Sequence, residues 1–140
     1  MSSAERCAVD TSVAVAALDA AHAAHRTCLD VVRRRRPVLA GHAAYEVFSV
    51  LTRMPGPLAV DPVVAGDLVH RVFPDVAWLA ADHSTALRLR IATLGITGGA
   101  VYDALVGEAA RTHGLTLLSR DLRASRTYDL LGVPWEPVGP

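Results

Sequence analysis

Lysine is absent from this 140-residue chain, and all 14 basic residues are arginine. The absence excludes mechanisms that need a lysine side chain, such as P-loop phosphate binding, Schiff-base catalysis and Ser–Lys dyads. Aromatic residues make up only 5% of the sequence and hydrophobic residues 51%, so the core must consist mainly of alanine, valine and leucine. A chain of this length is expected to form one domain over residues 1–140, large enough to fold without a metal or a disulfide.

Cysteine, net charge and long apolar runs are also scarce. Two cysteines, Cys7 and Cys28, are too few for a disulfide scaffold and lack zinc-ligand spacing, so we expect both to be reduced and buried. The 14 acidic residues cancel the 14 arginines, which argues against strong non-specific binding of duplex nucleic acid. No run approaches the roughly 18 apolar residues of a membrane span, and Asp10 interrupts the apolar segment that a secretory signal needs. We therefore expect a cytoplasmic protein with no membrane contact.

Short apolar runs alternate with helical segments along the chain. The expected strands cover residues 7–10, 38–40, 76–79, 115–118 and 133–138, the last being an edge strand because it carries two prolines. The expected helices cover residues 11–18, 21–33, 42–53, 61–73, 82–94 and 100–113, and a polar helical turn or loop follows Asp121. This alternation predicts an α/β fold with a mainly parallel sheet.

Four carboxylates stand where a charge is costly to bury. Asp10 ends the first expected strand, Asp121 follows the fourth, and Glu46 and Asp103 lie in apolar helical segments with no arginine three or four residues away. The carboxyl ends of strands form the ligand crevice of open α/β sheets, so we expect all four acids to face that crevice. Most other acids have ordinary positions; Glu108, for instance, is expected to face solvent near its neighbour Arg111.

Converging carboxylates repel one another. Two of them about 5 Å apart repel by roughly 3 kcal/mol at an effective dielectric near 20, unless some are protonated or a cation lies between them. An all-oxygen donor set suits Mg²⁺ or Mn²⁺ rather than Zn²⁺, and such ions serve phosphoester hydrolysis. Other interpretations stay open here, because Asp10 with Ser12 could form only a helix N-cap and Asp121 could be only a turn residue.

Two other classes of α/β phosphoryl enzyme fit less well. A HAD-type phosphatase requires a second aspartate two residues after its nucleophile, where this chain has Ser12. A receiver domain requires a lysine, which the chain lacks.

The acids lie in four segments that together resemble a PIN-domain ribonuclease, in particular the VapC toxins of bacterial VapBC toxin–antitoxin pairs. The segments are V-D-T-S at residues 9–12, Y-E-V-F-S-V-L-T-R at 45–53, Y-D-A-L-V-G-E-A-A at 102–110 and L-L-S-R-D at 117–121. The resemblance extends from residue 7 to about residue 138. It implies a PIN-like three-layer sandwich, in which helices flank a central, mainly parallel sheet.

The resemblance also implies a role for each acid. Asp10 and Asp103 would be the main direct ligands of Mg²⁺, for which Mn²⁺ could substitute. Glu46 would hold the metal or a water molecule on it, and Asp121 would complete the site.

Further residues around the acids are candidates for supporting roles. Ser12 and Ser119 match hydroxyl residues that the resemblance places beside the acids as hydrogen-bond donors. Arg53, two helical turns after Glu46, and Arg120 are candidates for contacts with RNA; Arg123, which like Arg120 adjoins Asp121, is a candidate for contact with substrate or antitoxin. Tyr45 and Tyr102 each precede one of the acids, and we expect them to pack in the core rather than to stack on a base.

The activity that the resemblance implies is cleavage of single-stranded or loop RNA, leaving a 5′-phosphate and a 3′-hydroxyl. The chain is thus expected to be a Mg²⁺- or Mn²⁺-dependent endoribonuclease and the toxin of a type II toxin–antitoxin system, acting on tRNA, rRNA or mRNA. Such toxins are homodimers whose cognate VapB-type antitoxin places its tail in the active-site groove. The alternative is a non-catalytic PIN-like module that binds RNA or a partner.

Overall fold

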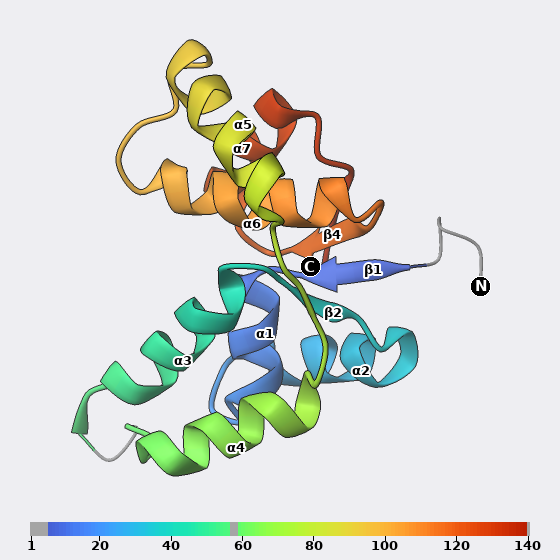
Figure 1. The fold of residues 1–140 in the computed structure, drawn as a ribbon. Coiled ribbons are helices and arrows are strands. Elements are labelled where there is room, and N and C mark those ends of the chain that lie inside the picture. Colours follow the sequence, from blue (N-terminus) through green and yellow to red (C-terminus); the bar gives the residue numbers. More distant parts are fainter. Residues whose placement is uncertain (1–5, 57–58, 140) are drawn as a thin grey trace.

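The structure is a computed structural model that describes residues 6–56 and 59–139; the remaining parts of the expected 1–140 domain lie outside the described residues. Its centre is a five-stranded parallel sheet with the order β3-β2-β1-β4-β5 (Figure 1). The strands are β1 (Cys7–Val9), β2 (Val38–Ala40), β3 (Val76–Ala77), β4 (Thr116–Ser119) and β5 (Trp135–Pro137). The predicted parallel α/β sheet is confirmed, and the proline-containing strand lies at an edge as expected.

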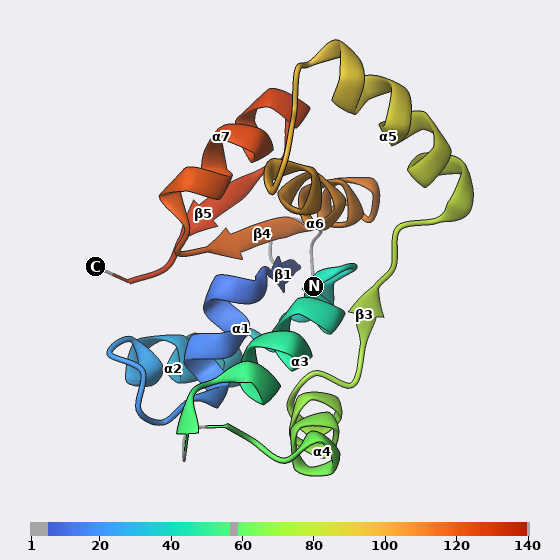
Figure 2. The same cartoon turned by 90° about the vertical axis from the view of Figure 1, so that its left-hand side faces the viewer.

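Helices cover both faces of the sheet and give the predicted three layers (Figure 2). One layer contains α1 (Thr11–Leu18), α2 (His25–Arg35), α3 (Ala43–Arg53) and α4 (Pro62–Val72). The other contains α5 (Ala81–Thr93), α6 (Ala100–Thr112) and α7 (Leu122–Leu131). Because both faces are covered, strand residues such as Leu39 and Leu117 are fully buried, and both cysteines are free and buried as expected. No helix among the described residues is long and apolar enough to cross a membrane.

The strand order creates a topological switch point at the centre of the sheet. From β1 the chain winds outward through β2 to β3, and later returns to the other side of β1 as β4 before it reaches β5. Connections that leave the two central strands therefore diverge, which opens a crevice at the carboxyl edge. Asp10 follows β1 directly and Asp121 follows β4 after one intervening residue, so both acids lie at this crevice.

The second helix begins later than the sequence indicates. We expected it from residue 21, but α2 starts at His25. The carboxylate of Asp19 accepts a hydrogen bond from the amide of Ala21 at 3.0 Å, and the ring of His22 accepts one from the amide of Ala24 at 3.0 Å. These local side-chain bonds hold the preceding residues in turns rather than in a helix.

Two further boundaries differ from expectation. The helix expected over residues 82–94 begins one residue earlier, with Ala80 as its N-cap, so Asp82 lies in the first turn of α5, where its carboxylate accepts a hydrogen bond from the His83 amide at 2.9 Å. A carboxylate is favourable there because the first turn of a helix carries partial positive charge. The third strand, expected to reach residue 79, ends at Ala77, the last residue that pairs with β2.

The segment after Asp121 is a ten-residue helix rather than a polar turn or loop. Asp121 caps its start, and Gly132, with a φ of 74°, ends it in the left-handed conformation. Residues 124, 127, 128 and 131 are buried, which is the spacing of one helical face. That spacing was visible in the sequence and would have predicted α7.

Glu108 is buried, so the expectation that it faces solvent is wrong. Its carboxylate accepts hydrogen bonds from Arg111 at 2.6 and 2.9 Å and from Arg90 at 3.1 Å. Burial alone would raise the pKa of Glu108, but the two arginines outweigh it and hold the pKa below its usual value. Arg90 also donates to the carbonyl of Leu131 at 3.2 Å, so this ion pair joins α5 and α6 to the end of α7.

The helices α6 and α7 approach one another closely at Gly107. A Cβ atom added there would lie 2.9 Å from Cδ1 of Tyr128 and 3.0 Å from Cγ2 of Val133. Real Cβ atoms do not come this close to a packed ring, so only glycine fits without movement of its neighbours. The position of the Tyr128 ring thus depends on the missing side chain at residue 107.

We expect Gly107→Ala to lower the free energy of unfolding by about 1–3 kcal/mol, because the added methyl group overpacks the interface between α6 and α7. Gly66→Ala in α4 is the matched control, since nothing lies within 4 Å of its added Cβ. That control should raise the free energy of unfolding by about 0.5–1 kcal/mol through helix propensity. Urea denaturation measures both values, and equal stabilisation by the two substitutions would contradict the close contact.

Candidate active site

Four carboxylates from four separate segments line one cavity of about 520 Å³ at the carboxyl edge of the sheet. They are those of Asp10, Glu46, Asp103 and Asp121. The acids follow β1, lie in the first turns of α3 and α6, and follow β4, respectively. The structure thus brings together all four acids that the sequence singled out, whereas their role as metal ligands stays a prediction.

Asp10 is buried and held by hydrogen bonds on both carboxylate oxygens. Its Oδ1 accepts from the hydroxyl of Ser12 at 2.6 Å and from the amide of Val13 at 3.3 Å, and its Oδ2 accepts from the hydroxyl of Tyr128 at 2.9 Å. Burial raises the pKa of Asp10, and these donors together with Ser119 oppose the rise. Asp10 is therefore an N-cap of α1 and a lining residue of the cavity at once.

Asp121 combines the same two roles at the start of α7. Its Oδ1 accepts hydrogen bonds from the amides of Arg123 at 3.0 Å and Ala124 at 3.1 Å. Its own amide donates to the hydroxyl of Ser119 at 3.0 Å. The two serines singled out by the sequence thus each contact one of the acids, Ser12 through Asp10 and Ser119 through the Asp121 backbone.

Glu46 and Asp103 are held less firmly than the other two acids: the Thr11 hydroxyl lies near Glu46 and opposes the rise of its pKa, but it forms no hydrogen bond of good geometry with a described residue. Burial raises the pKa of Glu46. Burial, followed by the charges of Asp121 and Glu46, raises the pKa of Asp103 from 3.8 to about 6. The four acids are therefore close enough to act on one another electrostatically.

No arginine neutralises this cluster directly. In the described part of the chain, none of the four carboxylates forms an ion pair within 4.0 Å. Arg53 and Arg123 line the same cavity, but their charges do not cancel the effects that raise the pKa values of Glu46 and Asp103. The sequence pointed to Arg53, Arg120 and Arg123 as candidates for contact. Arg53 and Arg123 line the acid cavity, whereas Arg120 lines a neighbouring cavity that shares Asp121 with it; their contact with RNA stays a prediction.

The oxygen atoms that line the cavity are of the type that binds a hard cation, but they are not arranged as a complete metal site. All four acids offer oxygen, and the buried hydroxyl of Thr11, also in the cavity wall, has no hydrogen-bond partner among the described residues. Within residues 6–56 and 59–139, however, no three acidic, histidine or cysteine side chains are arranged to hold a metal ion.

Comparison with known proteins agrees with this geometry. The family model described as PIN domain matches residues 7–130. The chain belongs to the PIN domain family. The resemblance drawn from the four acidic segments is thereby confirmed, and the PIN domain match includes every acid of the cavity.

Two ribonucleases from Mycobacterium tuberculosis align with nearly the whole chain. Ribonuclease VapC27 (strain ATCC 25618 / H37Rv) is 43% identical over 126 residues, which cover 90% of this chain and 92% of the relative. Ribonuclease VapC40 (strain CDC 1551 / Oshkosh) is 42% identical over 136 residues, which cover 94% and 98%.

Three tyrosines have positions that were not predicted from the sequence. Tyr128 lines the cavity and donates to Asp10, and the helical spacing of α7 was the signal that could have placed it. Tyr45 and Tyr102 are 64% and 51% exposed, so the expectation that they pack in the core is wrong. Both lie in the first turns of helices that begin at the open edge of the sheet, where their side chains reach solvent.

We expect Asp103→Asn to stabilise the protein in EDTA by about 1 kcal/mol at pH 8, since it removes repulsion from a half-exposed, partly screened carboxylate. The pKa of Asp103 is higher in the folded chain than its usual 3.8. Its contribution to stability is therefore complete below about pH 3.8 and is lost as the pH rises through about 6.

Urea denaturation at pH 4 and pH 8 checks this sign. The stability difference between Asp103→Asn and the parent should be larger at pH 8. Asp67→Asn, at an exposed position of α4, is the control and should show no such dependence. An equal difference at the two pH values would contradict the electrostatic explanation.

Proposed function

We propose that this chain is an endoribonuclease that requires Mg²⁺, or Mn²⁺ in its place, and cleaves phosphodiester bonds of single-stranded or loop RNA. The observation that carries the proposal is the cavity in which four carboxylates meet without an ion-pair partner among the described residues. Negative charge so concentrated is stabilised by a hard divalent cation. The names of VapC27 and VapC40, both ribonucleases, support the same activity for this chain.

The four acids would have different roles in binding the ion, depending on how many hydrogen bonds fix each carboxylate. Asp10 and Asp121, tied to hydroxyls and amides, would present ligand oxygens at fixed positions, whereas Glu46 and Asp103 could turn toward the ion. A divalent ion held by these carboxylates would lower the pKa of an attacking water molecule and stabilise the charge on the phosphate. With its pKa at about 6, Asp103 would be mostly ionised at neutral pH even before a cation binds.

The reaction would be hydrolysis at one phosphate of the RNA strand. Water adds to the phosphorus atom and the P–O3′ bond breaks, which leaves a 5′-phosphate and a 3′-hydroxyl. Arg53 and Arg123, exposed residues in the wall of the cavity, are placed to attract the phosphates on either side of the reacting one.

We also propose that the chain is the toxin of a type II toxin–antitoxin system. Its partners would be a VapB-type antitoxin, a second copy of the chain, and tRNA, rRNA or mRNA as substrate. Similarity to VapC27 and VapC40 over at least 90% of the chain supports this assignment. A non-catalytic PIN-like module that only binds RNA or a partner is the alternative that the following experiment separates.

Purified protein free of any antitoxin should cleave a labelled single-stranded RNA in Mg²⁺ and stop when EDTA is added. Asp103→Asn should lower the cleavage rate by at least about 100-fold, since a neutral amide binds a divalent cation much more weakly than a carboxylate does. The exposed-site variant Asp67→Asn is the matched control and should cleave at the parent rate. Gel electrophoresis of the labelled RNA gives the rates, and digestion with a 5′-phosphate-dependent exonuclease identifies the product ends.

Cleavage that proceeds equally in EDTA, or an Asp103→Asn variant as fast as the parent, would refute the proposed role of the acids. RNA that binds and stays intact in the presence of Mg²⁺ or Mn²⁺ would favour the non-catalytic alternative.

A further inference from the structure

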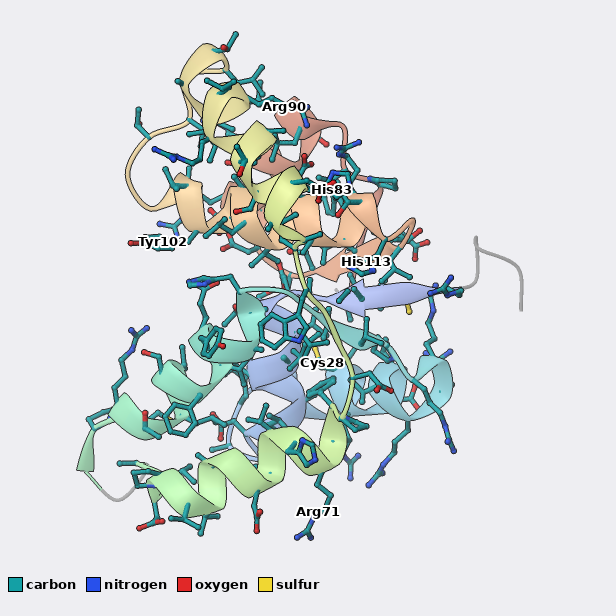
Figure 3. All side chains as sticks on the ribbon, in the orientation of Figure 1. Cys28, Arg71, His83, Arg90, Tyr102 and His113 are labelled. Atoms are coloured by element: carbon teal, nitrogen blue, oxygen red, sulfur yellow. The ribbon has the colours of Figure 1, made fainter. Side chains whose placement is uncertain are left out.

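Four aromatic side chains form a continuous row beside the acid cavity. The rings of Tyr102 and His42 stack with their centroids 5.4 Å apart and their planes at 21°. The His42 ring lies 6.2 Å from that of Tyr45, which lies 5.6 Å from the indole ring system of Trp78. We call these four residues the aromatic row; Figure 3 shows Tyr102 at the N-terminal end of α6, on the side where α3 begins.

The aromatic row is exposed to an extent that packing does not explain. Trp78 is 49% exposed. Tyr45 and Tyr102, two of the three tyrosines of the chain, each expose about half or more of their surface to solvent. Phe73 and Tyr128, by contrast, are almost completely buried. A chain with only 5% aromatic residues thus leaves three of its largest rings uncovered at one place.

One end of the aromatic row belongs to the wall of the acid cavity. Tyr102 and Glu46 line both that cavity and a smaller neighbouring one of about 260 Å³. The smaller cavity is otherwise lined by His42, Tyr45 and Ser49. A strand that places one phosphate at the acids can therefore place its adjoining nucleotides on the rings.

We propose that the aromatic row is the platform on which unpaired bases of the RNA substrate stack beside the cleaved phosphate. This inference rests on the proposed nuclease function and adds the residues that select unpaired RNA. Every base offers a flat π-face, but in a duplex those faces are covered by neighbouring base pairs. Because the rings already contact one another at usual aromatic distances, bases would stack on their exposed faces rather than between them.

The surroundings of the row favour RNA over a protein partner. The smaller cavity mixes rings with the hydroxyl of Ser49 and the carboxylate of Glu46, whereas a protein interface core is depleted in charged residues. The row contains no arginine, so its contribution to binding comes from the rings. Stacking is tolerant of sequence, and the platform would select unpaired structure rather than a particular base.

Binding of a fluorescein-labelled single-stranded oligoribonucleotide tests the proposal in the Asp103→Asn background, where the RNA is not cut. Tyr45→Ala and Trp78→Ala should each raise Kd about 5- to 100-fold, as expected for the loss of one stacked base. Tyr45→Phe keeps the ring and should bind within about twofold of its background. Leu89→Ala removes a 75% exposed apolar side chain from α5, outside the row, and is the matched control.

An RNA probe with abasic sites separates stacking from other effects of the substitutions. Abasic sites should weaken binding to the unsubstituted row at least as much as Trp78→Ala does, and should weaken the Trp78→Ala variant by a smaller factor, since that variant has already lost one stacked base. In a Trp135→Phe variant, Trp78 is the only tryptophan of the chain, and its fluorescence should be quenched by the intact probe but not by the abasic one.

Unchanged RNA affinity in Tyr45→Ala and Trp78→Ala would overturn the proposal. If these variants instead lose self-association in analytical ultracentrifugation while their RNA affinity stays constant, the row is a protein interface and the proposal is equally wrong. Metal-dependent cleavage by the parent chain would leave the nuclease function standing in both cases. A parent chain that never cleaves RNA would refute the nuclease function separately from the binding measurements.

Discussion

Mutual repulsion among four carboxylates is the constraint on which the site depends. The fold gathers them at the switch point between β1 and β4, and no arginine of the described chain pairs with any of them within 4.0 Å. The cost appears in the pKa of Asp103, which burial and the three neighbouring acids raise to about 6. Glu108 shows the opposite solution, because two arginines neutralise it and its pKa falls. The chain thus compensates a buried charge where it serves packing and leaves the charges of the cavity uncompensated.

Helix capping and site formation are the same interaction at two of the four acids. Asp10 and Asp121 each follow a strand and cap the next helix, so the backbone amides that need an acceptor also fix the carboxylates. A cap alone would satisfy those amides anywhere on the surface. What distinguishes these two caps is their place at adjacent strand ends, where the parallel order brings them into one cavity with Glu46 and Asp103.

The sequence was sufficient for features that depend on local pattern and strand direction. Convergence of the acids followed from parallel strands whose carboxyl ends share one edge. Burial of Glu108 was not predictable in this way, because Arg90 comes from a helix 18 residues earlier in the chain. The prediction that Tyr45 packs in the core was wrong for a similar reason, since an apolar helical pattern does not reveal how far the first turn of a helix extends beyond the sheet.

Phosphate recognition by acids and a cation carries no information about base pairing, because every nucleotide has the same phosphate. A chain with no net charge also lacks the broad positive field that would attract any nucleic acid. In the proposed nuclease, discrimination between paired and unpaired RNA would then come from a surface that contacts the bases. The aromatic row is the surface we propose for this role, and its position is constrained because Tyr102 precedes Asp103 on α6 and Tyr45 precedes Glu46 on α3. In the proposed complex, the helices that bring two acids to the phosphate would also bring two rings to the adjoining bases, so one arrangement of helices would set both where the strand is cut and which strand fits.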